Sequence, residues 1–155
     1  TFTHFVFPGD YFGEEFLMQQ QKRGTFANVL SGEAQIEEYL ASQVKEDPSA
    51  IEILKNSFLN RIGRIQNTLV RNTKLNLRAR LIDLLQTIGK GGGVTLLNGE
   101  ILIRVHLKHR ELATLINATR QSVTTQLIEL TNENLIKIDK NSILLTSKML
   151  SNEPK

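Results

Sequence analysis

Apolar residues recur at helical spacing along much of the chain, beginning after residue 32. The first such stretch, residues 33–43, carries Ile36, Tyr39 and Leu40 on one face of a predicted helix. Residues 1–32 instead mix β-forming residues with Pro-Gly and other turn residues, which predicts strands and turns. We therefore expect a β-rich segment at the start of the chain, followed by a short helix.

A much longer helix is predicted from residue 48 to about residue 72. Asp47 suits the N-cap, and Pro48 suits the first helical position because its missing N–H would have no partner there. Four apolar residues are spaced by 4, 3 and 4 positions, as in a coiled coil: Phe58, Ile62, Ile65 and Leu69. We call these four residues the dimerisation seam, because we interpret them as the contact with a second copy of the chain. Packing of the helix on its own domain is the alternative.

A third helix is predicted within residues 75–93, where Gly89 and the run Gly91-Gly92-Gly93 should end it. The glycine run closes a helix rather than opening one, so it does not match a phosphate-binding loop. The pair Asn98-Gly99 then separates two β-forming runs, which predicts a tight hairpin.

Residues 107–130 hold two short helical stretches with room for only a tight turn between them. Ala113 in the first stretch is small enough to let the second helix approach closely. Asn117 occupies the bend, where Asn tolerates a left-handed backbone, and Thr119 suits the N-cap of the second helix. The pattern predicts a helix-turn-helix with an apolar inward face made of Leu112, Leu115, Ile116, Val123, Leu127 and Leu130.

The second of these helices begins with hydrogen-bonding side chains that no core requires. In a major groove, Arg reads guanine and Gln reads adenine, while hydroxyl groups suit phosphates or base edges. An ordinary solvated helix face would carry Glu and Lys, and none occurs between residues 119 and 128. We therefore predict a DNA-reading helix with these contact residues: Thr119, Arg120, Gln121, Ser122, Thr124 and Thr125.

A two-stranded hairpin is predicted directly after this helix, because apolar residues alternate on both sides of residues 139–142. A hairpin in that position is a wing. Lys137, Lys140 and Asn141 would lie near flanking phosphates, and so would His109 of the first helix. These contacts would add affinity that depends on salt rather than on base sequence.

Charge agrees with a polyanionic partner for the second half of the chain. The net charge is +3, but residues 1–70 hold 6 Lys/Arg and 9 Asp/Glu, whereas residues 71–155 hold 13 and 7. Cysteine is absent, which excludes disulfides and thiolate metal sites. The three histidines form neither a metal-ligand spacing nor a catalytic arrangement, so we expect no metal, no catalytic residue and no enzyme. With no membrane-spanning run and no signal peptide, we expect a cytoplasmic protein.

The order of "GDYFGEE", a long helix, "LNLRARLIDLL", a hairpin and "LKHRELATLINATRQSVTTQLIELTNENLIKID" resembles the Crp/Fnr superfamily of bacterial transcription regulators over residues 5–145. The resemblance implies an α+β chain with three parts: a remnant of a cyclic-nucleotide-type β-roll with its following helix in residues 1–47, a central dimerisation helix in residues 48–74 and a winged helix-turn-helix DNA-binding domain in residues 75–155. It also implies a homodimer that binds a near-palindromic operator in double-stranded DNA, with RNA polymerase as a further partner. The stretch "ATRQSVTTQLIELTNENLIKIDKNSILL" is most similar to the cyanobacterial global nitrogen regulator branch.

The resemblance extends to an effector site, but with departures. Three residues match the family's phosphate cassette: Gly13, Glu14 and Arg23. Gly24 replaces the usual Ser or Thr, and Ile65-Gln66 replaces the Thr-Ser pair of cyclic AMP binders, which argues against cyclic AMP. A different small anion such as a 2-oxo acid, or no effector, is expected instead. Only the last part of the β-roll is expected here, so the chain looks N-terminally incomplete.

The DNA-reading helix also departs from the family. Thr125 stands where most members carry a guanine-reading Arg, so the family's usual half-site is not carried over. Lys108 replaces the customary Ser or Thr cap of the first helix, which should leave that end weakly capped. The missing arginine at position 125 and the modest net charge keep a second hypothesis open: a winged-helix protein-interaction module without specific DNA binding.

Overall fold

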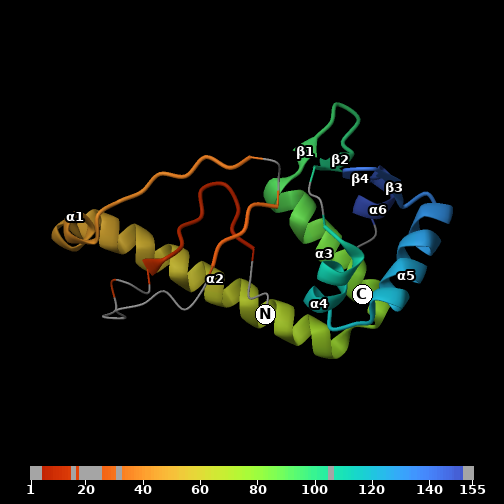
Figure 1. The fold of residues 1–155 in the computed structure, drawn as a ribbon, viewed down its shortest axis with the longest axis horizontal. Coiled ribbons are helices and arrows are strands. Elements are labelled where there is room, and N and C mark those ends of the chain that lie inside the picture. The colour runs from red at the N-terminus through yellow and green to blue at the C-terminus, as the bar shows by residue number, and fades with distance from the viewer. Residues whose placement is uncertain (1–4, 15–16, 18–25, 31–32, 105–106, 152–155) are drawn as a thin grey trace. The chain divides into compact units, whose positions relative to one another are not determined.

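The computed structural model describes residues 5–14, 17, 26–30, 33–104 and 107–151. Its contacts divide into two units, one within residues 4–68 and the other from residue 69 onward. Each unit is described by itself (Figure 1).

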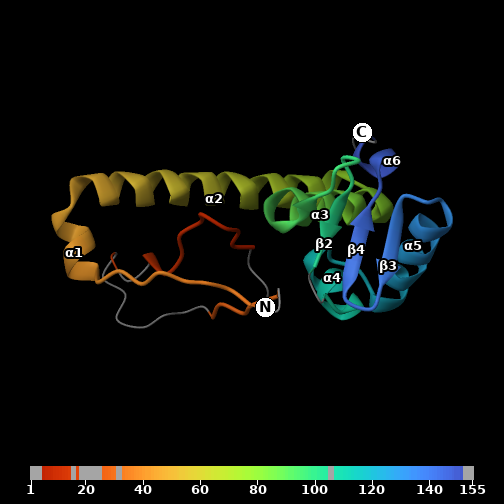
Figure 2. The same ribbon diagram turned by 90° about the horizontal axis from the view of Figure 1, so that it is seen from above.

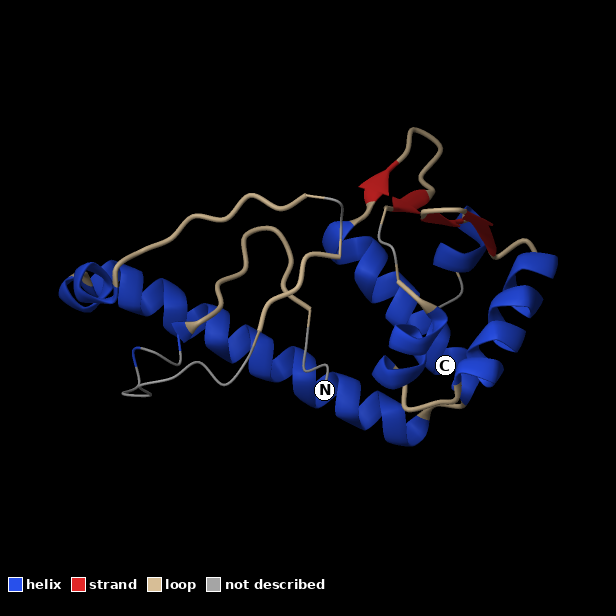
Figure 3. Cartoon of the chain, in the orientation of Figure 1, coloured by secondary structure: helices blue, strands red, loops and turns tan. Residues whose placement is uncertain are grey.

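In the first unit, the described segments ahead of residue 41 are loops and single turns (Figure 3). The strands expected in residues 1–32 are therefore absent from 5–14, 17 and 26–30, and the rest of that range lies outside the described residues. The helix predicted at 33–43 is also wrong, because helix α1 spans only Ala41–Glu46.

The physical reason lies in three apolar side chains that remain exposed: Ile36 at 56%, Tyr39 at 62% and Leu40 at 66%. A short helix is stabilised mainly by burying its apolar face, and helical spacing alone does not supply a covering element. Within the described chain, nothing covers that face.

Helix α2 spans Pro48–Lys74 and confirms the predicted long helix. Its start is capped as expected, since the Asp47 carboxylate accepts hydrogen bonds from the backbone N–H groups of Ser49 at 2.8 Å and Ala50 at 3.3 Å. None of the apolar side chains of α2 falls in the buried class, whereas Arg61 does, at 9% exposure. The apolar side chains of this helix are therefore at most half-buried within the described chain.

The second unit contains a small antiparallel sheet with helices packed against it. Its elements are α3 (Leu77–Gly92), β1 (Val94–Thr95), β2 (Ile101–Ile103), α4 (His109–Leu115), α5 (Arg120–Asn132), β3 (Ile136–Asp139), β4 (Ser142–Leu145) and α6 (Ser147–Leu150). The strands lie in the order β1-β2-β4-β3, and every neighbouring pair is antiparallel. Helices α3 and α5 lie against this sheet (Figure 2).

The core of this unit joins all of its layers. Its fully buried side chains come from three helices, the sheet and α6, and each contributes about 1.5–3 kcal/mol relative to an exposed position: Leu81, Leu85, Ile103, Leu112, Ile116, Val123, Leu130, Ile136, Leu145 and Met149. The inward face predicted for the helix-turn-helix is confirmed, with Leu115 only half-buried.

The glycines near the end of α3 serve both packing and termination. The helix ends within the predicted run Gly91-Gly92-Gly93, which confirms that part of the prediction, but it continues through Gly89, so Gly89 itself does not end it. A Cβ on Gly89 would lie 2.8 Å from Leu145 Cδ1, which means that only Gly allows α3 to approach the sheet this closely. Gly93 is the C-cap, and its N–H donates to the Gly89 carbonyl at 2.9 Å.

The hairpin predicted at Asn98-Gly99 is confirmed. Gly99 has a φ of +80°, and its N–H donates to the Leu96 carbonyl at 2.9 Å. The strands on either side, β1 and β2, pair antiparallel. The left-handed φ explains why Gly occupies the turn.

Candidate nucleic-acid interface

Helices α4 and α5 form the predicted helix-turn-helix. Asn117 lies in the turn with a φ of +50°, as expected for a left-handed residue there. The Ala118 N–H donates to the Ala113 carbonyl at 2.9 Å and closes the turn. Ala113 is only 4% exposed, so its small side chain lies where the helices meet.

The start of α4 is better capped by hydrogen bonds than the sequence suggested. Lys108 occupies the N-cap, and its ammonium group cannot accept a hydrogen bond from the backbone. Glu111 compensates, because its carboxylate accepts the Lys108 N–H at 2.7 Å. The expectation of a weak cap was therefore incomplete, since half of a capping box is present.

Thr119 caps α5 as predicted. Its hydroxyl oxygen accepts the Ser122 N–H at 3.1 Å and lies 2.8 Å from the Ser122 hydroxyl. The two hydroxyl groups are thus hydrogen-bonded to each other at the start of the helix. Their first role is to hold the first turn of α5 in place.

The outward side chains of α5 differ in their exposure and in whether their hydrogen-bonding groups already have a partner. Arg120, Gln121 and Thr125 are exposed, while Ser122 and Thr124 are half-buried. Thr124 and Thr125 donate their hydroxyls to carbonyls one turn earlier, at 2.9 Å and 3.2 Å. Within the described residues, the Arg120 guanidinium and the Gln121 amide have no side-chain partner and remain available.

His109 at the start of α4 is joined to α5. Its Nδ1 lies 2.8 Å from the Thr124 hydroxyl oxygen. Since that hydroxyl already donates to the Arg120 carbonyl, it accepts from the Nδ1–H of the imidazole. The Nε2 atom of His109 is the ring nitrogen left for another partner.

The wing is present as predicted. Strands β3 and β4 pair in the register Ile136↔Leu145 and Ile138↔Ile143, so that Lys140 and Asn141 form the turn. Both turn residues and Lys137 are exposed. The wing therefore presents basic side chains to solvent, which is the placement required for phosphate contacts.

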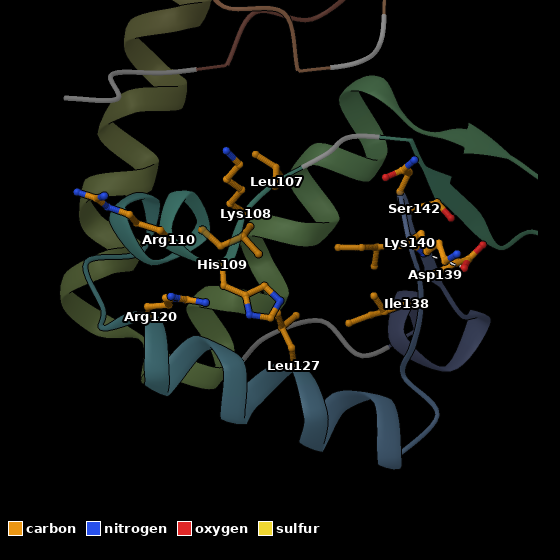
Figure 4. A pocket seen from close by; sticks show the side chains of 13 residues that line it. Leu107, Lys108, His109, Arg110, Arg120, Leu127, Ile138, Asp139, Lys140 and Ser142 are labelled. Atoms are coloured by element: carbon orange, nitrogen blue, oxygen red, sulfur yellow. Dashed lines mark hydrogen bonds between the residues drawn. The ribbon is translucent and has the colours of Figure 1, made fainter.

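A hollow of about 510 Å³ lies between α4, α5 and the wing, and we call it the wing hollow. Its basic residues are Lys108, Arg110, Arg120 and Lys140, with His109 beside them and Asp139 as the one acidic residue of its lining. Arg110 and Arg120 lie at one side, and the wing residues face them across the space (Figure 4). This balance of charge suits a polyanion.

Two of these basic residues were not predicted as contacts. Lys108 entered the sequence prediction only as a helix cap, and Arg110 did not enter it. Both flank His109 in the sequence "KHR", so a basic cluster at the start of a helix was the available signal.

The residues expected to hold an effector are only partly placed. Gly13 has a φ of +86°, and Glu14 is 8% exposed. Glu14 is paired with Arg61 of α2, and burial lowers the pKa of the Arg61 guanidinium. Arg23 lies outside the described residues. No local pattern in the sequence points to the Glu14–Arg61 pair, because the partners are 47 positions apart.

The dimerisation seam is partly accessible. Leu69 is 62% exposed, whereas Phe58, Ile62 and Ile65 are half-buried. Within the described residues, no group of three His, Cys, Asp or Glu side chains could hold a metal ion. Across the same part of the chain, no helix has the length and apolar character needed to cross a membrane.

Residues 79–150 match the family model of the Crp-like helix-turn-helix domain. No curated protein matches the chain in sequence. Among solved structures, the chain is similar to TTHA1359, a transcriptional regulator of the CRP/FNR family from Thermus thermophilus, with 18% identity and a TM-score of 0.57, over 69% of this chain and 57% of that one.

It is also similar to TTHB099, a CRP-family transcriptional regulator from the same organism, with 21% identity and a TM-score of 0.57, over 70% of this chain and 57% of that one. A CooA mutant from Carboxydothermus hydrogenoformans has 18% identity and a TM-score of 0.62, over 71% and 50% of the two chains. At these identities the likeness concerns the fold alone. The chain spans about half the length of these proteins.

Proposed function

We propose that this chain, whose residues 79–150 match the Crp-like helix-turn-helix domain, is a transcription regulator of the Crp/Fnr family that binds a near-palindromic operator as a homodimer. This function is that of a regulator, so we infer that the chain acts by binding DNA rather than as an enzyme. A cytoplasmic location and contact with RNA polymerase would accompany this function.

One observation carries the proposal. The first turn of α5 holds two exposed side chains with unused hydrogen-bonding groups, Arg120 and Gln121, next to the basic wing hollow. Arg and Gln are the side chains that read guanine and adenine in the major groove. Basic residues on α4 and on the wing would hold the flanking phosphates.

The homodimer is supported by α2. It is 27 residues long, yet none of its apolar side chains is fully buried within the described residues, and Leu69 of the seam is 62% exposed. A helix of this length with a seam at coiled-coil spacing needs a partner to cover that seam. A second copy would also pair two reading helices with the two halves of a palindrome.

We also propose that a small molecule other than cyclic AMP controls the chain, without naming that molecule. Glu14 is engaged by Arg61, so a ligand that bound at Glu14 would compete with that ion pair. A small anion that bound Arg61 would likewise have to displace the Glu14 carboxylate. Nothing in the comparisons supports the closer assignment to the cyanobacterial nitrogen regulators, which stays a prediction.

Selection of bound duplexes from a random pool tests the proposal, followed by affinity measurements over a series of salt concentrations. We expect a defined palindrome, and we expect log affinity to fall against log salt by about 0.9 for each phosphate contact. If every duplex binds only with weak, salt-sensitive background affinity, the chain is a protein-interaction module instead. Repeating the selection with candidate anions tests for an effector.

A further inference from the structure

We propose that Thr125 reads a thymine through its methyl group, so that the half-site of this chain carries an A·T pair at the position that this side chain faces. The inference rests on the proposed function, because it concerns which bases the same helix selects. An Arg at this position would have offered hydrogen bonds to guanine, and Thr offers none of them.

The hydroxyl group of Thr125 is engaged within α5. It donates to the Gln121 carbonyl at 3.2 Å, one turn earlier in the same helix. A hydroxyl engaged in this way faces the helix backbone and not the solvent. Since Thr125 is exposed, its methyl group is what it presents outward.

Thr125 has two neighbours on the same face of α5. Side chains three or four positions apart lie one above the other on a helix, so Gln121 and Ile128 flank Thr125. Both are exposed, and Ile128 reaches 56%. We call Gln121, Thr125 and Ile128 the outward stripe. It is uncharged, and two of its members, Thr125 and Ile128, offer aliphatic groups, while Gln121 offers an amide.

The outward stripe lies outside the basic surface of the domain. Arg120 lines the wing hollow together with Lys108 and Lys140, whereas no residue of the outward stripe does (Figure 4). The uncharged outward stripe thus lies outside the basic hollow, and Arg120 is the one residue of the hollow that we also propose to read a base. The stripe matches the one apolar group that base pairs offer in the major groove, the C5-methyl of thymine, with an adenine for Gln121 beside it.

The test uses the full chain and a duplex selected from a random pool. Each thymine is replaced in turn by deoxyuridine, which lacks only the C5-methyl group. We expect the wild type to lose about 3- to 5-fold in affinity at one thymine of each half-site, as befits one methyl group buried. Thr125→Ser keeps the hydroxyl but has no methyl, and it should bind the thymine and uracil duplexes equally.

Thr131→Ser is the matched control. Thr131 makes the same kind of hydrogen bond, from its hydroxyl to the Leu127 carbonyl at 2.8 Å, near the end of α5 and outside the stripe. This variant should keep the wild-type uracil penalty. Equal melting temperatures of the three proteins would show that the substitutions leave the fold intact.

Two results overturn the inference while leaving the proposed function standing: a selected duplex without any uracil penalty, or a penalty that Thr125→Ser retains. Failure to select any duplex overturns both. A penalty that disappears in Thr125→Ser and persists in Thr131→Ser supports the assignment of the thymine contact to Thr125.

Discussion

His109 of α4 and Thr124 of α5 are joined by a hydrogen bond of 2.8 Å between Nδ1 and Oγ1. The Thr124 hydroxyl in turn donates a hydrogen bond to the Arg120 carbonyl at 2.9 Å. His109, which we expect to lie near the phosphates, is therefore coupled to the backbone of the first turn of the reading helix. A network of this kind holds both groups in one orientation before DNA arrives.

Thr124→Val should weaken this coupling, because valine has the shape of threonine but no acceptor for His109. We expect the free energy of unfolding to fall by about 0.5–1.5 kcal/mol, the usual contribution of one hydrogen bond, with a parallel loss of operator affinity. Chemical denaturation and fluorescence anisotropy measure the two effects. Thr124→Ser keeps the oxygen and should retain most of both. Equal behaviour of the Val and Ser variants would contradict the coupling.

Arg120→Ala should relax sequence preference. Loss of one bidentate base contact costs about 1–3 kcal/mol on the preferred duplex and little on unrelated duplexes. Lys140→Ala is the matched comparison, since Lys140 lies in the wing turn. It should weaken binding to all duplexes alike and lower the salt slope by about 1. Binding that is unchanged in Arg120→Ala would remove this residue from the reading surface.

The helix-turn-helix could be predicted from sequence because its signals are local. Asn117 in the turn and Thr119 at the cap each specify the backbone within a few residues. A second left-handed Asn, Asn134 with a φ of +58°, carries the same kind of signal and was missed. It follows α5, where the Leu135 N–H donates to the Leu130 carbonyl at 2.9 Å and closes the helix end.

The start of the chain could not be predicted in the same way. Ile36, Tyr39 and Leu40 have helical spacing, but spacing says nothing about what covers them, and all three are exposed. The role of Gly89 could not be predicted either. A side chain at this position would collide with Leu145, a strand residue that is distant in sequence. The Glu14–Arg61 pair depends on the same kind of distant contact.

Gly89→Ala should destabilise the second unit. The new Cβ would lie 2.8 Å from Leu145 Cδ1 and 3.3 Å from Ile101 Cγ2, and Leu145 is fully buried. Overpacking of this kind costs about 1–3 kcal/mol, more than the roughly 1 kcal/mol that alanine gains over glycine in a helix. Gly63→Ala on α2 meets nothing within 4 Å and should be neutral or stabilising. Thermal unfolding compares the two. A stable Gly89→Ala protein would mean that the helix shifts without loss.

The ion pair between Arg78 and Glu133 predicts a pH dependence. The hydrogen bond from Arg78, at 2.6 Å, lowers the pKa of the Glu133 carboxyl. A folded pKa below the unfolded value of about 4.3 means that the pair stabilises fully above that pH and loses its effect as the pH falls through the folded pKa. Arg78→Gln should therefore melt below the wild type at pH 7 and together with it at about pH 2.

Arg104→Gln is the control for that series, since Arg104 is exposed and has no ion pair in the described chain. Its melting temperature should differ from that of the wild type by the same small amount at both pH values. A difference for Arg78→Gln that persists in acid would assign the effect of Arg78 to packing instead of charge.

Leu69→Glu should separate the proposed homodimer. Leu69 is 62% exposed and belongs to the dimerisation seam, while its neighbour Val70 is 49% exposed and lies outside the seam. Since both side chains are exposed in the single chain, a Glu at either position leaves the fold of that chain intact. In a dimer, however, a Glu at position 69 would be buried without a partner, which costs several kcal/mol. Sedimentation equilibrium should therefore find Leu69→Glu monomeric at concentrations where Val70→Glu is dimeric, with operator affinity at least tenfold weaker for the first variant. A dimeric Leu69→Glu protein would place the contact between copies on another face of the helix.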